Sequence, residues 1–211
     1  MTSSDTVAGI IDSIRGQREK FERFCRSLSE EELARPVPDS AWVVKDFVSH
    51  LGALDPELAR TFEAAASGRP EDADRNADGT PFDLDGFNDA QVAQRRGWSL
   101  ERILEEAAGK RAALIETLDR FTDEDVSRVM HFQGDAKRSP ANLPLKAFLM
   151  GWSLHDPIHV ADMLKALPER ADDPELAAWL SHPVIQGYQQ AMAGPRRPST
   201  LRRGSGQAGS G

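Results

Sequence analysis

Two histidines four residues apart in a helical stretch are the side chains of this sequence best placed to do chemistry. They are His155 and His159, in the segment "LHDPIHVAD". Side chains at positions i and i+4 share one face of a helix, so both imidazoles could reach one metal ion. Neutral imidazole is also the commonest metal-ligating side chain. The pair alone is a weak signal, and its value depends on a third ligand elsewhere in the chain.

His50 is the candidate third ligand. It follows Phe47 by three residues and precedes Leu54 by four, so it lies on or beside the apolar stripe of another predicted helix. His155 and His159 likewise continue the apolar stripe of their own helix. One inward histidine is usually a core residue with hydrogen-bond partners. Three of them suggest a metal site whose remaining position is open to water or substrate, as in catalytic zinc sites.

Pro157 lies between the two paired histidines and predicts a kink or a break there. A proline inside a helix removes a backbone donor, clashes with the carbonyl of Ser153 and disfavours helical geometry at Asp156. The alternative is a true break, with Asp156 as N-cap and Pro157 as the first residue of a new helix. Asp156 and Asp162 could accept the free N–H of ligand histidines, or could both be solvated.

The elements that must position these residues are helices. Apolar residues recur at threes and fours in four long segments, and strand signals are nearly absent. We therefore predict an all-α fold, a four-helix bundle with extra short helices. Ser99 is a good N-cap for the third helix, and Pro56 should kink the second or end it early. The segments run from Val7 to Leu28, from near Trp42 to Phe62, from Ser99 to Phe121 and from Leu143 to Leu167.

The remaining segments are polar or short. Ser67–Asp85 reads as a long surface loop, and a short helix should follow over Gly86–Arg96. The loop and this helix would flank the mouth of the site, where Asn88 could hydrogen-bond a substrate and Arg95 could hold a carboxylate. The alternative is that both are ordinary surface residues. The sequence also predicts a capping box in "SLSEEEL", an extended piece in "VSRVMHFQG", and one or two short helices within 172–194.

Composition bounds the domain organisation and the partners. The chain has 211 residues, which suits one domain over 1–194 and a disordered tail over 195–211 that is rich in Pro, Arg, Ser and Gly. The net charge of −8 argues against nucleic acid as a partner. No apolar run approaches a membrane span, and the N-terminus lacks a signal-peptide pattern. We therefore expect a cytoplasmic protein that does not bind membranes.

The single cysteine, Cys25, excludes an intrachain disulfide. It lies in the apolar stripe of the first helix, between Phe24 and Leu28, so we interpret it as a buried structural thiol. The chain then offers no reactive nucleophile of its own, and an external thiol or water would have to serve.

Three quoted stretches resemble a known family. "SAWVVKDFVSHLGALD" and "WSLHDPIHVADML" are similar to the second and fourth helices of DinB-like proteins. "FNDAQVAQRRGWSLERILEE" resembles the linker and third helix of the branch related to the N-terminal domain of mycothiol-dependent maleylpyruvate isomerase. The resemblance covers roughly residues 5–168. It implies a four-helix bundle that holds one divalent metal ion, zinc or nickel, with His50, His155 and His159.

The resemblance also bears on activity. The isomerases proper have a glutamate at the position of His155, and they carry a second, C-terminal domain. The roughly forty residues after Leu167 are too few for that domain, so isomerase activity is not the first expectation. The resemblance implies a metal-dependent transferase that joins a low-molecular-weight thiol, such as mycothiol or bacillithiol, to an electrophilic small molecule. A hydrolase or isomerase on the same site, and a non-catalytic metal- or ligand-binding module, are the alternatives. The chain could also form a homodimer.

Overall fold

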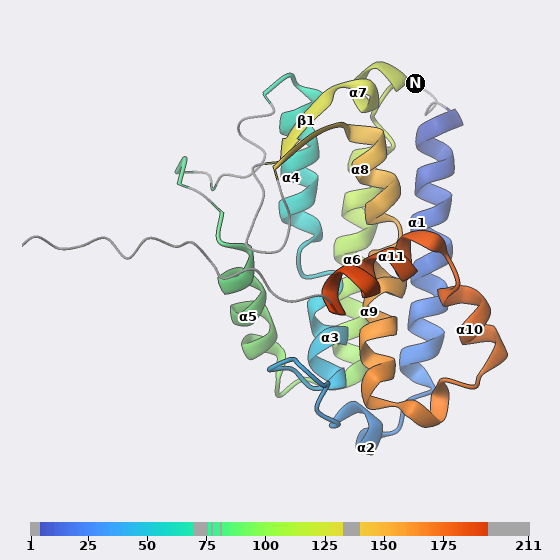
Figure 1. The fold of residues 1–211 in the computed structure, drawn as a ribbon. Coiled ribbons are helices and arrows are strands. Elements are labelled where there is room, and N and C mark those ends of the chain that lie inside the picture. Colours follow the sequence, from blue (N-terminus) through green and yellow to red (C-terminus); the bar gives the residue numbers. More distant parts are fainter. Residues whose placement is uncertain (1–4, 70–75, 77, 81, 133–139, 194–211) are drawn as a thin grey trace, which may run out of the picture.

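The computed structural model describes residues 5–69, 76, 78–80, 82–132 and 140–193. It has the predicted all-α architecture, a helical bundle in which α1 and α6 are single helices and the pairs α3–α4 and α8–α9 are stacked end to end (Figure 1). The helices of the bundle and its additions are α1 (Asp5–Arg26), α2 (Glu30–Leu33), α3 (Val44–His50), α4 (Asp55–Ala66), α5 (Leu84–Arg95), α6 (Leu100–Leu118), α7 (Asp123–Ser127), α8 (Leu145–Trp152), α9 (His155–Met163), η2 (Leu164–Ala166), η3 (Pro168–Arg170), α10 (Pro174–Leu180) and α11 (Pro183–Ala193).

A small antiparallel hairpin joins α7 to α8. It consists of β1 (Val129–Phe132) and β2 (Ala141–Pro144), with His131 opposite Asn142. The predicted extended piece in "VSRVMHFQG" corresponds to β1. The hairpin packs at the same end of the bundle as α4 and α8 (Figure 1).

The second predicted helix is broken into α3 and α4, and Gly52 explains where. Its φ is +100°, a conformation that side chains with a Cβ rarely adopt. A Cβ at this position would lie 2.6 Å from the Cβ of Ala107 on α6, so glycine also permits close packing there. The sequence analysis attributed an interruption to Pro56, but the break comes before it, and Pro56 sits in the first turn of α4. His50 thereby becomes the last residue of α3.

The fourth predicted helix is also broken, and the break falls just before the histidine pair. α8 ends at Trp152, and α9 begins at His155 with Leu154 as its N-cap. The alternative of a true break is thus the observed one, although Asp156 is not the N-cap. Pro157 lies in the first turn of α9, where backbone N–H groups have no intrahelical partner and a proline costs little.

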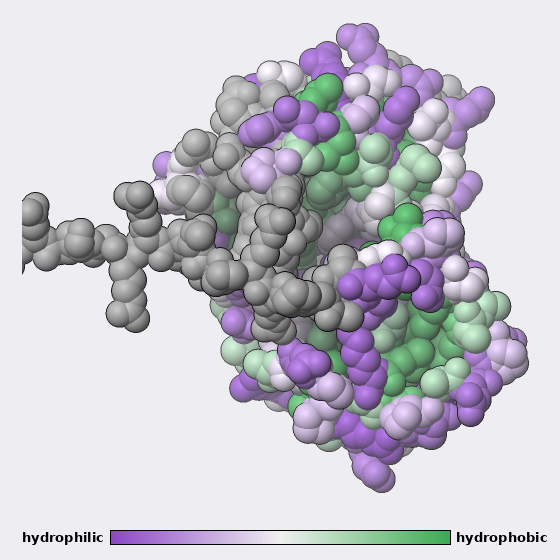
Figure 2. All heavy atoms as spheres, in the orientation of Figure 1, coloured by the Kyte–Doolittle hydropathy of each residue, from purple (hydrophilic) through white to green (hydrophobic). Residues whose placement is uncertain are grey.

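The hydrophobic core has two halves. One half contains residues of α3, α9 and the C-terminal part of α1, and the other contains residues of α4, α8 and the N-terminal part of α1. Figure 2 shows hydrophilic residues along most of the outer edge of the face in view, while hydrophobic residues lie mainly inward. Within the described ranges, no helix combines the length and apolar character needed to cross a membrane.

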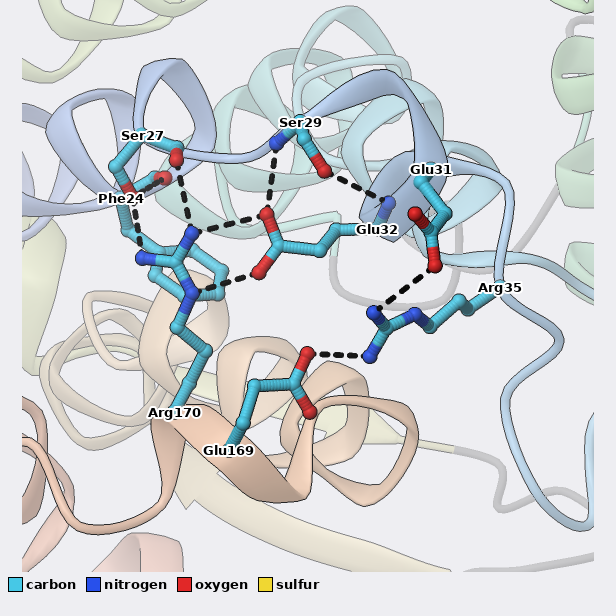
Figure 3. A network of polar contacts seen from close by, with 8 residues as sticks. All are labelled: Phe24, Ser27, Ser29, Glu31, Glu32, Arg35, Glu169 and Arg170. Atoms are coloured by element: carbon cyan, nitrogen blue, oxygen red, sulfur yellow. Dashed lines mark hydrogen bonds and ion pairs between the residues drawn. The ribbon is translucent and has the colours of Figure 1, made fainter.

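Ion pairs join the segment around α2 to η3, which follows the histidine helix α9 (Figure 3). Glu32 accepts two hydrogen bonds from Arg170, at 2.7 and 2.9 Å, and Arg170 also donates to the carbonyl oxygen of Ser27 at 2.9 Å. Arg35 pairs with Glu169 beside them. The hydrogen bonds from Arg170 lower the pKa of Glu32 to about 2.

The same glutamate completes the predicted capping box. Its backbone N–H donates to the hydroxyl of Ser29, and its carboxylate accepts from the backbone N–H of Ser29. Glu32 therefore both starts α2 and anchors η3, which fixes the segment that follows the histidine helix.

Ser67–Asp85, predicted as a long loop, is only partly described. The described residues up to Asp83 form neither helix nor strand, and α5 begins at Leu84 rather than at Gly86. Two short helices, α10 and α11, occupy the region 172–194 as expected. The predicted disordered tail, residues 195–211, lies outside the described residues, and the predicted division into one domain and a tail stays a prediction.

Candidate metal centre

Two helix ends bring the three histidines together. His50 is the last residue of α3, whereas His155 and His159 occupy the first residue and the second turn of α9. His50 is 5% exposed, and the other two are partly buried. Ring centroids lie 4.7 Å apart for His155 and His159, and His50 lies 5.4 and 5.1 Å from them. The predicted third histidine thus does lie beside the helical pair.

The nitrogen positions suit a metal ion. The Nε2 atoms of His155 and His159 are 3.1 Å apart, and one ligand atom from each histidine lies within 4.8 Å of the others. Two nitrogens on one tetrahedral zinc ion would be about 3.3 Å apart, given Zn–N bonds of about 2.0–2.1 Å. The pair is already near this spacing, and the ligand atom of His50 lies within 4.8 Å of both. The three histidines could therefore hold a divalent ion.

Asp162 fixes the tautomer of His159. The Nδ1 of His159 lies 3.1 Å from Oδ2 of Asp162, where Nδ1–H donates to the carboxylate. The Nε2 lone pair of His159 then faces the other histidines, as metal binding requires. The structure places Asp162 in the position relative to His159 that the sequence analysis suggested for it.

The surroundings of His155 favour its neutral form, and those of Asp162 favour its ionised form. Burial, together with the nearby His159 and His50, lowers the pKa of His155 well below its usual value, which favours the neutral ring that binds metals. Burial alone would raise the pKa of Asp162. Hydrogen bonds from His159, Lys165 and a residue of α11 outweigh this effect and lower that pKa to about 2. Asp162 is thus ionised at neutral pH.

Aromatic side chains surround the histidines. Trp152 stacks on His155 with a centroid separation of 4.0 Å, while Trp42 lies 5.2 Å from His50 and Phe47 lies 5.6 Å from His159. These rings limit the orientations of the imidazoles. Periodicity placed Phe47 on the apolar stripe of its helix but did not reveal the contacts of these rings with the histidines.

A layer of buried charges crosses the bundle next to the site. Arg111 donates to Asp55 at 2.6 Å and lies 3.5 Å from Asp156, and Arg18 lies 3.1 Å from Asp156. All four residues are at most 6% exposed. The layer lies between the two halves of the core, at the level of both helix breaks. Asp156, suggested above as a hydrogen-bond partner of a ligand histidine, makes its described contacts with these arginines instead.

The sequence analysis missed Arg18, Arg111 and Asp55. A usable signal was present, because Arg18 follows Ile14 by four residues and precedes Phe21 by three, in the middle of an apolar stripe. A charge at such a position is buried, and a buried charge requires a partner. Which partner it meets depends on the packing of α1 against α6 and α9.

The two candidate substrate residues lie on the inner face of α5. Arg95 is 3% exposed and is held by Glu106 at 2.5 and 2.9 Å and by Gln91, so its guanidinium is engaged within the protein. Asn88 is 9% exposed, and its Oδ1 has no hydrogen-bond partner among the described residues. Of these two residues, Asn88 is the one that has a polar atom without a described hydrogen-bond partner.

Cys25 is fully buried, as predicted, and is the sole cysteine. Burial raises the pKa of its thiol well above the usual value. Since the thiolate is the reactive form, this residue is a poor nucleophile.

Comparison with known proteins shows that the sequence matches a protein family. Residues 14–155 match the family model of the mycothiol maleylpyruvate isomerase N-terminal domain. The match covers more than half of the chain and ends at His155, so His159 and Asp162 lie beyond it. No curated protein is a significant match to the sequence.

Solved structures share the fold at low identity. A crystal structure of the mycothiol-dependent maleylpyruvate isomerase has a TM-score of 0.56 and 15% identity, over 81% of this chain and 65% of that one. A histidine-to-alanine mutant of such an isomerase gives 0.55 and 13%, over 74% of this chain and 60% of that one. The chain thus spans less than two thirds of the length of these relatives, and the likeness establishes the fold alone.

Proposed function

The chain belongs to the family of the mycothiol maleylpyruvate isomerase N-terminal domain, and from this membership we propose that it is a metal-dependent transferase. It would join a low-molecular-weight thiol of the mycothiol type to an electrophilic small molecule. The names of the matched family and of the similar structures both include mycothiol, which supports a thiol as co-substrate.

One observation carries the proposal, namely the three histidines whose ligand atoms lie within 4.8 Å of one another beside an ionised Asp162. His50, His155 and His159 would hold one divalent ion, zinc or nickel. When bound, such an ion supplies positive charge that favours thiolate over thiol and polarises an electrophile.

The protein's own residues then have definite roles. Asp162 orients His159 through its Nδ1–H, and the low pKa of His155 keeps that ring neutral. Trp152 and Trp42 pack against His155 and His50 and limit the orientations of these imidazoles. Cys25 is buried, so the attacking sulfur must come from outside the chain. The buried Oδ1 of Asn88 has no hydrogen-bond partner among the described residues, and a substrate that reaches it would gain an acceptor there.

The test is a thiol-dependence assay. The protein is stripped of metal, reloaded with zinc or nickel, and incubated with mycothiol and monobromobimane, from which the sulfur displaces bromide to give a fluorescent thioether. We expect product above the uncatalysed rate only when both metal and thiol are present. Metal-dependent turnover of an ester panel without thiol would favour the hydrolase. If the metal-loaded protein turned over neither monobromobimane with mycothiol nor any of the esters, a non-catalytic binding module would be favoured.

A further inference from the structure

A glutamine of α11 reaches the histidine helix. The side-chain nitrogen of Gln189 donates to Oδ1 of Asp162 at 3.1 Å and to the carbonyl oxygen of Ile158 at 3.3 Å. A primary amide nitrogen carries two hydrogens, so it can serve both acceptors. The two acceptors flank His159 along α9, and the amide therefore spans the turn that carries this candidate ligand.

The carboxylate of Asp162 divides its oxygens between two tasks. Oδ2 accepts from His159, whereas Oδ1 accepts from Gln189 and, at 2.7 Å, from Lys165. Lys165 comes from the next turn of the same chain segment, and its side chain is 42% exposed. Gln189 is partly buried and comes from another helix that packs against α9. It is thus the described donor that ties Asp162 to a separate part of the fold.

We propose that Gln189 is a positioning residue of the metal centre, which acts on His159 through Asp162 and makes α11 part of the site. The inference rests on the metal site of the proposed function. The family match ends at His155, so this chain of contacts is built by residues outside the matched range.

The physical reason is restraint. An aspartate carboxylate whose Oδ1 is held only by the partly exposed Lys165 of its own chain segment can turn about its side-chain bonds and lose the hydrogen bond to the imidazole. A second donor at Oδ1, held by a neighbouring helix, removes that freedom before the metal binds. Outer partners of this kind commonly change metal affinity without touching the metal.

The experiment uses the full chain and measures zinc affinity by competition with a chromophoric chelator. Gln189→Leu should weaken zinc binding roughly 3- to 10-fold, less than the roughly 10- to 100-fold typical of a direct partner of a ligand histidine. Gln190→Leu, at the exposed neighbouring position of α11, is the matched control and should leave the affinity unchanged. Gln189→Asn, which is too short to reach Asp162, provides a second variant if Gln189→Leu does not fold.

A double-mutant cycle separates positioning from general packing. If Gln189 acts through Asp162, Gln189→Leu should have no further effect on zinc affinity in an Asp162→Asn background. The cobalt-substituted wild type and Gln189→Leu should also differ in visible absorption, because the geometry at His159 changes. Equal losses in both backgrounds, or an unchanged affinity in the folded single variants, would overturn the inference while the metal site stands. A wild-type chain that binds no zinc, nickel or cobalt would overturn the proposed function and this inference together.

Discussion

His50 ends α3 and His155 begins α9, and their imidazole centroids lie 5.4 Å apart. Each histidine therefore stands at a break in a longer helical column, and the two breaks lie at the same level of the bundle. The two breaks thus bring histidines from both columns to one level of the bundle.

The first prediction concerns metal binding. Purified protein should bind close to one divalent ion per chain, and replacing His155 and His159 together with alanine should abolish binding. Native mass spectrometry or elemental analysis measures the stoichiometry. His131→Ala is the control, since His131 lies on β1 and pairs with Asn142. Full metal occupancy in the double variant would exclude the proposed site.

The second prediction tests the buried charge layer. Arg111→Met should lower the free energy of unfolding by about 3–5 kcal/mol, because Asp55 and Asp156 would be left buried without this cation. Arg120→Met is the control, because the ion pair of Arg120 with Glu63 is solvent-exposed and such pairs contribute at most about 1 kcal/mol. Chemical denaturation gives both values. Equal effects of the two substitutions would refute the importance of the layer.

The third prediction concerns the glycine at the break between α3 and α4. Gly52→Ala should destabilise the protein by about 1–3 kcal/mol, because φ is +100° and the new Cβ would meet Ala107. It should also weaken zinc binding by displacing His50. Gly109→Ala, in open space on α6, should instead stabilise the protein by about 0.5–1 kcal/mol. Thermal unfolding distinguishes the two, and a neutral Gly52→Ala would contradict the steric argument.

The fourth prediction is a pH dependence. Arg170 lowers the pKa of Glu32 to about 2, from a usual value of 4.5. Because the folded pKa is the lower one, the ionised pair stabilises the fold above about pH 4.5, and this contribution is lost as the pH falls from about 5 towards 2. The difference in unfolding free energy between wild type and Glu32→Gln should therefore shrink over that range. Glu105→Gln, exposed on α6, should show no comparable trend. A difference that stays constant with pH would contradict the assignment.

The fifth prediction concerns the C-terminal residues. A chain that ends at Gly194 should melt within about 2 °C of the full-length protein, because residues 195–211 hold little apolar surface to bury. Differential scanning calorimetry compares the two chains. A drop of many degrees would show that these residues pack against the bundle.

Local periodicity was sufficient to predict the bundle and much of the candidate site. Inward positions follow from spacings of three and four residues, which is why His50, His155 and His159 could be proposed together. Ser99 as an N-cap and the capping box of Ser29 also depend only on nearby residues. A proline between two histidines suggested a kink or a break. The predicted N-cap of the new helix, Asp156, lies two residues after the observed N-cap, Leu154.

Contacts between distant residues were decided only by the tertiary structure. Three sets of contacts join segments that lie 11 to 138 residues apart in the sequence. Asp156 contacts Arg18 and Arg111, Glu106 binds Arg95, and Gln189 reaches α9. A charged side chain has several partners within its reach, and the packing of helices selects one of them. The sequence by itself thus determined which residues face inward, whereas the packing determined which of them meet, because periodicity fixes the face of a helix but not the neighbour that covers it.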